Sequence, residues 1–102
     1  MAKKALGQNF LLDGNITAKI INLSLSKQNK ASYAGDFVYE VGPGPGGLTR
    51  AVLSHDPRKL TVVEMDERCI AIMEDIKSKV GDKLSIINGD ALQQNFAELD
   101  SA

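Results

Sequence analysis

A loop rich in glycine and proline, set between a predicted strand and a predicted helix, constrains this sequence more than any other feature. The run G-P-G-P-G-G at Gly42–Gly47 follows the short apolar segment Phe37–Val41 and precedes a short helical pattern over Leu48–Ser54. Its glycines fit the pattern G-x-G-x-x-G, which lets a ligand approach the backbone and the free N–H groups of a helix start. No Gly-Lys-Ser/Thr follows, which excludes a P-loop. The loop predicts a nucleotide or cofactor site, with a tight turn that binds no ligand as the other interpretation.

The chain after the loop continues to alternate between strand and helix patterns. Strands are predicted over Leu60–Val63 and Leu84–Ile87, and a helix over Glu67–Val80 lies between them. Asp66 is the expected N-cap of that helix and Gly81 its C-terminal stop. The order β-α-β-α-β predicts an α/β fold with parallel strands and right-handed crossovers, as in half of a doubly wound sheet.

A further helix is predicted before the first strand, beginning near Asn15. Its apolar stripe comprises Ile16, Ile20 and Leu23 at helical spacing. Ile21 and Leu25 lie beside this stripe, and the polar segment that follows connects the helix to the first strand.

The residues around the loop favour a ligand with a positive centre over a pyrophosphate. Glu40 lies just before the loop, where its carboxylate would repel a pyrophosphate and attract a sulfonium or ammonium group. Pro43 and Pro45 remove two backbone donors that an anion would use. Both features favour S-adenosylmethionine over a dinucleotide.

Two more acids follow the second and third predicted strands, at the same edge of the sheet. Glu64 comes 18 residues after Gly46, near the ~20-residue spacing at which a carboxylate accepts hydrogen bonds from two ribose hydroxyls. Asp90 is placed to accept a hydrogen bond from an exocyclic amino group such as that of adenine. The competing interpretation of Asp90 is a turn formed with Asn88 and Gly89.

Composition narrows the class of protein without identifying a partner. With 43% hydrophobic and 25% charged residues, the sequence is typical of a soluble globular domain. It shows no signal peptide and no membrane span, and a lone Cys69 can form neither an internal disulfide nor a metal cluster. We therefore expect a cytoplasmic protein that binds no metal. Residues 1–36 carry a net charge of +3 and residues 37–102 a net charge of −4, so the N-terminal part either meets a polyanion or is merely solvated.

Four motifs in order resemble the ribosomal RNA adenine dimethyltransferase family: K-K-A-L-G-Q-N-F-L-L-D at Lys3–Asp13, E-V-G-P-G-P-G-G-L-T at Glu40–Thr49, V-V-E-M-D at Val62–Asp66 and N-G-D-A at Asn88–Ala91. The resemblance implies a partial Rossmann-like methyltransferase fold that uses S-adenosylmethionine. It also implies dimethylation at N6 of adjacent adenines of small-subunit rRNA during ribosome assembly, with rRNA or the pre-small-subunit particle as partner. Carried over to this sequence, the implied cofactor-binding residues are Asn9, Leu11, Glu40, Gly42, Gly44, Glu64 and Asp90.

One family motif has no counterpart here. Nothing like the N-L-P-Y segment that holds the target adenine occurs in residues 91–102, so no catalytic residue is assigned. We expect residues 1–36 to contribute to the cofactor site and residues 37–102 to form the first half of the methyltransferase domain. The 102 residues by themselves are expected to be inactive. We also expect them to associate as a homodimer, through the open edge of the first strand or by exchange of the N-terminal helix or the C-terminal tail. The alternatives are a macrolide-resistance type of rRNA adenine methyltransferase, an NAD-binding Rossmann fragment and a non-catalytic RNA-binding module.

Overall fold

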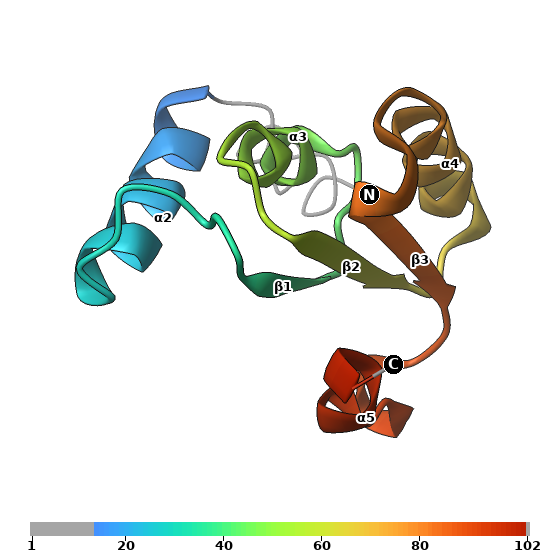
Figure 1. Cartoon of the computed structure of the whole chain (residues 1–102). Helices are drawn as coiled ribbons and strands as arrows, with labels where there is room; N and C mark the ends of the chain where they lie inside the picture. The colour runs from blue at the N-terminus through green and yellow to red at the C-terminus, as the bar shows by residue number, and fades with distance from the viewer. Residues whose placement is uncertain (1–13, 102) are drawn as a thin grey trace.

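The computed structural model describes residues 14–101, which form an α/β fold (Figure 1). The strands are those that the sequence predicts, each extended by no more than one residue at either end. The elements are α2 (Gly14–Lys27), β1 (Phe37–Val41), α3 (Gly47–Ser54), β2 (Lys59–Glu64), α4 (Glu67–Val80), η1 (Gly81–Lys83), β3 (Leu84–Asn88), η2 (Ala91–Gln93) and α5 (Phe96–Ser101).

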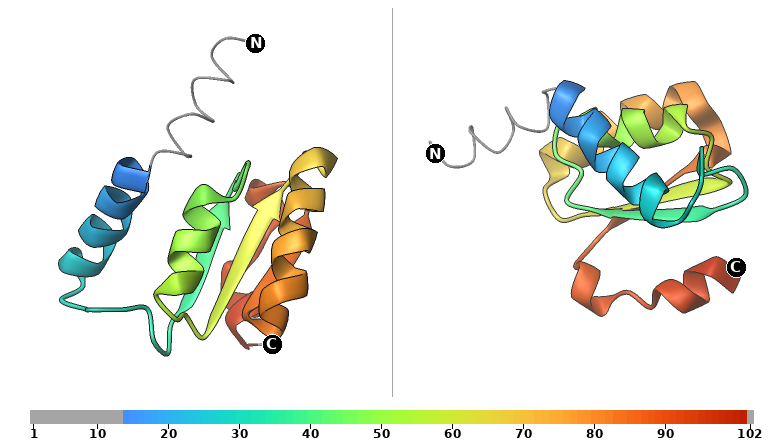
Figure 2. Two further views of the ribbon diagram at one scale, coloured as in Figure 1. Left: turned by 90° about the horizontal axis from the view of Figure 1, so that it is seen from above. Right: turned by 90° about the vertical axis from the view of Figure 1, so that its left-hand side faces the viewer.

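The strands form a parallel sheet in the order β1-β2-β3, and the register pairs Val38 with Leu60 and Leu60 with Leu84. Helices α2, α3 and α4 lie on one face of this sheet, while η2 and α5 lie on the other (Figures 1 and 2). Placing α3 and α4 on one face is what two right-handed crossovers in the same direction require. The partial Rossmann-like fold predicted from the sequence is confirmed.

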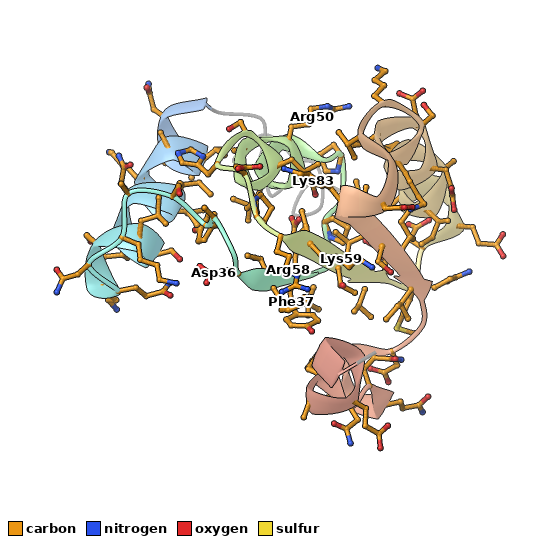
Figure 3. The ribbon with its side chains drawn as sticks, in the orientation of Figure 1. Asp36, Phe37, Arg50, Arg58, Lys59 and Lys83 are labelled. Carbon is orange, nitrogen blue, oxygen red and sulfur yellow. The ribbon has the colours of Figure 1, made fainter. Side chains whose placement is uncertain are left out.

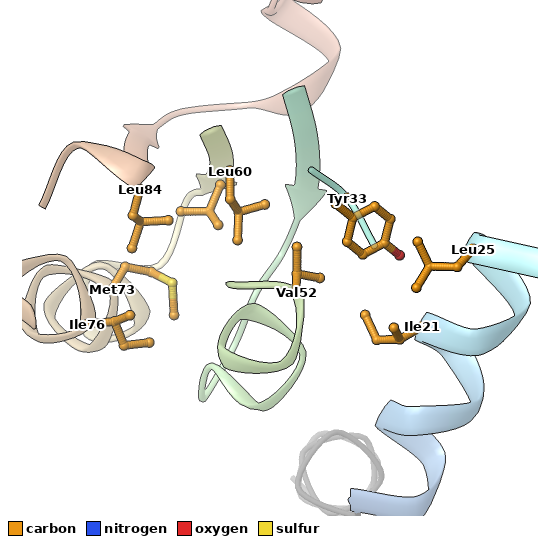
Figure 4. Close-up of a cluster of buried hydrophobic side chains, with 9 residues drawn as sticks. Ile21, Leu25, Tyr33, Val52, Leu60, Met73, Ile76 and Leu84 are labelled. Atoms are coloured by element: carbon orange, nitrogen blue, oxygen red, sulfur yellow. The ribbon is translucent and has the colours of Figure 1, made fainter. Parts of the chain in front are cut away.

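The main hydrophobic core lies between the sheet and its three covering helices (Figure 4). Leu60 and Val62 of β2 and Leu84 of β3 are completely shielded from solvent. Helix α4 contributes Met73 and Ile76 at the spacing seen in the sequence. The side chains that complete the cluster come from α3, α2 and the α2–β1 connection: Val52, Ile21, Leu25 and Tyr33.

Helix α2 packs into the core through residues beside the apolar stripe noted in its sequence. Ile20 and Leu23 are 41% and 57% exposed, and the buried face is formed by Thr17, Ile21 and Leu25. These three residues recur at intervals of four, and Ile21 and Leu25 belong to the cluster that contains Val52. The predicted helix is confirmed, and of the apolar residues noted in its sequence it is Ile21 and Leu25, beside the stripe, that are buried.

Both expected ends of α4 are confirmed. The side chain of Asp66 accepts a hydrogen bond from the backbone N–H of Arg68 at 2.9 Å, which satisfies one of the donors at the helix start. Gly81 follows the last residue of the helix with a φ of +67°.

Two cations, Arg58 and Lys30, contact residues near the amino end of β1. The guanidinium of Arg58 lies 5.1 Å from the ring centroid of Phe37 (Figure 3), and Lys30 forms an ion pair with Asp36 at 2.6 Å. The charges of Lys30 and Asp36 are already counted in the net +3 of residues 1–36, so the polyanion interpretation stays a prediction. Helices α2 and α4, each of 14 residues, are the longest in the described part of the chain and fall short of the ~20 residues of a membrane span.

Gly46 holds the start of α3 close to α4. Its φ is +90°, and a Cβ added there would lie 2.9 Å from Cδ1 of Ile76 and 3.2 Å from Cε of Met73. Gly35 has a similar φ of +82° with no heavy atom within 4 Å of an added Cβ. Substitution by alanine would strain the backbone at both positions but would crowd neighbouring side chains only at Gly46.

We expect Gly46→Ala to lower the free energy of unfolding by about 2–3 kcal/mol and Gly35→Ala by about 1 kcal/mol, since only the first adds crowding to the left-handed backbone. Urea unfolding followed by circular dichroism measures both. Equal losses would mean that Ile76 and Met73 move aside freely and that crowding plays no part.

Candidate functional site

The candidate site lies at the carboxyl edge of the sheet, where the strand ladder continues one residue past its regular ends. The N–H of Gly42 donates to the carbonyl of Val63 at 2.9 Å, and the N–H of Gly89 donates to the carbonyl of Glu64 at 3.0 Å. Glu64 is in register with Asn88. The loop after β1 and the turn after β3 therefore flank the end of β2, which is where ligands bind in open α/β sheets.

The three predicted acids lie on neighbouring strands but at different levels. Glu40 pairs with Val62, two residues before Glu64, while Asp90 lies two residues beyond Asn88. Because a strand rises ~3.3 Å per residue, successive acids are offset by about 7 Å along the strand direction. The arrangement suits an extended ligand that contacts the acids in sequence.

Glu40 is a half-buried carboxylate with no ion-pair partner among residues 14–101. Its Oε1 accepts a hydrogen bond from Oγ1 of Thr49 on α3 at 2.6 Å. Burial raises the pKa of the Glu40 carboxyl above its ordinary value, and the hydrogen bond from Thr49 lowers that pKa by less. A cation arriving beside this carboxylate would replace the hydration that burial removes.

The glycine loop turns sharply before α3 begins. The N–H of Gly46 donates to the carbonyl of Pro43 at 3.2 Å, and both Gly42 and Gly44 have positive φ, +65° and +56°. Since the N–H of Gly42 belongs to the sheet ladder, any backbone contact from Gly42 to a ligand falls to its carbonyl oxygen or Cα. No heavy atom lies within 4 Å of a Cβ built on Gly42, so the backbone there is open to a close approach.

Glu64 is held by its own backbone. Its Oε2 accepts hydrogen bonds from the N–H groups of Met65 at 2.9 Å and Asp66 at 3.0 Å. In the described part of the chain Oε1 has no recorded partner, which makes it the oxygen open to a ligand hydroxyl. The two bonds to Oε2 fix the carboxylate before any ligand arrives.

Asp90 is engaged in the same manner. Its Oδ1 accepts from the N–H of Leu92 at 2.9 Å and so caps the short helix η2. Its carbonyl accepts from the side-chain amide of Gln94 at 3.1 Å. The structure therefore gives Asp90 a capping role toward η2, which follows it, while Asn88 ends β3. Oδ2 of Asp90 is not used by this cap.

Two of the predicted site residues, Asn9 and Leu11, lie outside the described residues.

Thr49 also belongs to this site, although the sequence pattern gave it no predicted role. A threonine in the first turn of a short apolar helix gives little signal of a role in a site. Its position nine residues after Glu40, across the glycine loop, is the one sequence feature that relates Thr49 to the site.

Among residues 14–101, no group of three or more His, Cys, Asp or Glu is arranged to hold a metal ion.

Comparison of the sequence with known proteins finds clear relatives. A family model described as ribosomal RNA adenine dimethylase matches residues 1–102. Ribosomal RNA small subunit methyltransferase A of Mesorhizobium japonicum is 50% identical over 101 residues, covering 99% of this chain and 34% of that protein. The proteins of the same name from Chelativorans sp. and Ruegeria sp. are 48% and 50% identical, covering 96% and 90% of this chain and 34% and 31% of their own length. The chain therefore spans about a third of the length of these curated relatives.

Glu40 makes stability depend on pH in a defined direction. Because burial raises the pKa of its carboxyl in the folded chain, the folded chain keeps this proton to a higher pH than the unfolded chain does. The stability that the neutral carboxyl contributes is full below the unfolded-state pKa and is lost as the pH rises through the folded-state pKa.

We therefore expect Glu40→Gln, which cannot ionise and still accepts from Thr49, to gain stability relative to the parent as the pH is raised from about 4 to about 7. Urea unfolding at several pH values measures the difference. Replacement of the exposed Glu74 by Gln is the control for removing a carboxylate. A difference between Glu40→Gln and the parent that stays constant with pH would contradict the prediction.

Proposed function

Because this chain belongs to the ribosomal RNA adenine dimethylase family, we propose that it forms the S-adenosylmethionine-binding portion of an rRNA adenine N6,N6-dimethyltransferase. The acceptor would be adjacent adenines of small-subunit rRNA, met during ribosome assembly in the cytoplasm. The relatives, each a ribosomal RNA small subunit methyltransferase A, support a small-subunit target over the macrolide-resistance type. Within this proposal, residues 1–36 contribute to the cofactor site and residues 37–102 form the first half of the methyltransferase domain.

One observation carries the choice of ligand: the half-buried carboxylate of Glu40 beside the glycine loop, without an ion-pair partner in the described part of the chain. A pyrophosphate at this loop would meet a like charge in a site of reduced dielectric. A zwitterion with a sulfonium and an ammonium would meet an opposite charge. The arrangement thus supports a methyl donor over a dinucleotide.

Each of the remaining site residues would contact a different part of the ligand. The carbonyl of Gly42 and the turn at Gly44 would lie against the methionine part, and Oε1 of Glu64 would accept from the ribose hydroxyls. Oδ2 of Asp90 would accept from the adenine amino group. Asn9 and Leu11 would complete the site from the N-terminal segment.

The bound cofactor would supply an electrophilic methyl group to adenine N6, and this chain's part is to bind and orient it. Holding the target adenine falls to the family's N-L-P-Y-type motif, which these 102 residues do not contain. We therefore expect the chain by itself to bind cofactor without transferring methyl groups. Transfer of a radiolabelled methyl group to assembling small subunits above background would contradict this.

Calorimetry with S-adenosylhomocysteine and with NADH tests the proposed ligand. We expect S-adenosylhomocysteine to bind and Glu64→Ala to weaken it by about 10- to 100-fold, since a hydrogen bond to a charged group contributes about 1.5–3 kcal/mol. Glu64→Gln, which keeps an acceptor for the N–H groups of Met65 and Asp66, separates loss of the turn from loss of charge. Glu67→Gln, on the exposed first turn of α4, is the matched control. Binding of NADH alone would favour the dinucleotide alternative.

The open edge of β1 supports self-association. In the described part of the chain β1 pairs only with β2. The carbonyl of Asp36 and the N–H of Gly42 both bond toward β2, so the backbone groups of Phe37, Tyr39 and Val41 point away from it. A hollow of about 370 Å³ lies between α2 and this strand, lined by Ser24 and Gln28 on one side and Phe37 and Tyr39 on the other. We propose that two copies pair through β1, because exposed strand edges recruit other strands.

Light scattering at micromolar concentration tests this pairing, and we expect a dimer of the 11.0 kDa chain. Val41→Lys should yield a monomer, since lysine on an edge strand opposes strand addition and Val41 is already 61% exposed. Leu92→Lys, at a residue 94% exposed and away from the edge, is the control. A parent chain that is monomeric would refute the pairing.

A further inference from the structure

Thr49 is a polar residue in an otherwise apolar environment. It lies in the first turn of α3, is completely shielded from solvent, and packs against Met73 of α4, whose sulfur is 3.8 Å from Oγ1. A buried hydroxyl without a partner is costly by about 1–3 kcal/mol, so such groups are nearly always bonded. Here the hydroxyl donates to Oε1 of Glu40 at 2.6 Å, across the glycine loop.

The bond matters more to Glu40 than to Thr49. No cation pairs with this carboxylate among residues 14–101, and Thr49 is its one recorded hydrogen-bond donor there. Charged groups on adjoining elements have other hydrogen-bond partners. Arg50 of α3 donates to the carbonyl of Pro45, and Glu64 of β2 accepts from its own turn. The residues of α4 that pack toward this region, Met73 and Ile76, are apolar.

We propose that Thr49 is a positioning residue of the cofactor site, which holds Oε1 of Glu40 so that Oε2 is presented to the positive end of the ligand. The inference rests on the proposed function for its ligand. Without the hydroxyl the carboxylate is free to rotate about its last torsion. It is also protonated more readily, because the hydrogen bond from Thr49 to its charged form is gone. Both changes weaken attraction for a cation, and the second is reversed by raising the pH.

Three variants separate positioning from packing. Thr49→Val keeps the shape and removes the hydroxyl, whereas Thr49→Ser keeps the hydroxyl and removes a methyl group. Thr61→Val removes another buried hydroxyl, on the central strand β2, where the side chain is 6% exposed. Circular dichroism and urea unfolding establish that each variant is folded.

Calorimetric binding of S-adenosylmethionine is then measured near neutral pH. We expect Thr49→Val to bind about 10-fold more weakly, in line with losing a hydrogen bond to a charged group. Thr49→Ser and Thr61→Val should stay within about 2-fold of the parent. An equal loss in Thr49→Ser, or parental affinity in Thr49→Val, would each overturn the proposal.

A second readout does not depend on the ligand. Carboxyl-carbon NMR titration of the ligand-free chain reports the protonation of Glu40, and its midpoint should move to higher pH in Thr49→Val but not in Thr49→Ser. An unchanged midpoint in Thr49→Val would refute the coupling whether or not cofactor binds. Failure of the parent chain to bind S-adenosylmethionine would instead refute the proposed function and with it the assigned role in the site. The coupling would still be decided by the titration.

Discussion

The complete burial of β2 is the constraint on which the rest of this structure depends. Leu60 through Val63 are shielded on both faces of the strand, and both of its edges are paired, with β1 on one side and β3 on the other. A strand buried in this way has no alternative register that keeps Leu60 and Val62 against the helices and Val63 on the opposite face. Because both neighbours run parallel to β2, each needs a crossover helix, and α3 and α4 follow from that requirement.

The same constraint creates the site. With three parallel strands in register, the segments that leave their carboxyl ends emerge on one edge, and that is where the glycine loop, Glu64 and Asp90 lie. The acids gain their individual environments from local turns. Glu64 and Asp90 each use one oxygen to cap a turn in their own strand exit, which leaves the other oxygen in a fixed direction. A capping role and a binding role are therefore compatible in a single carboxylate.

The parts of this fold that could be predicted from sequence are those decided by local pattern. Strands β1, β2 and β3 are short apolar runs between turn residues, and α4 carries its own cap in Asp66 and its own stop in Gly81. The buried face of α2 could not be predicted, because Ile20 and Ile21 belong to adjacent stripes that both carry apolar residues. The position of α3 and Tyr33 decides between them, and that position is a property of the tertiary structure. The bonds of Glu64 to its own turn escaped prediction for another reason: the sequence gives the carboxylate but not its rotamer.

Met73 connects this packing to the chemistry of the site. Its terminal carbon lies against Gly46, which allows α3 to start close to α4, and its sulfur lies against the hydroxyl of Thr49, which bonds to Glu40. Methionine is unbranched and polarizable, so it fills the irregular space left beside a glycine and a bonded hydroxyl. An apolar residue in place of Glu40 would remove the cost of a half-buried carboxylate, so the fold retains this group at the expense of stability. The helix packing that stabilises the sheet is thus also what holds the Glu40 carboxylate in place beside the glycine loop.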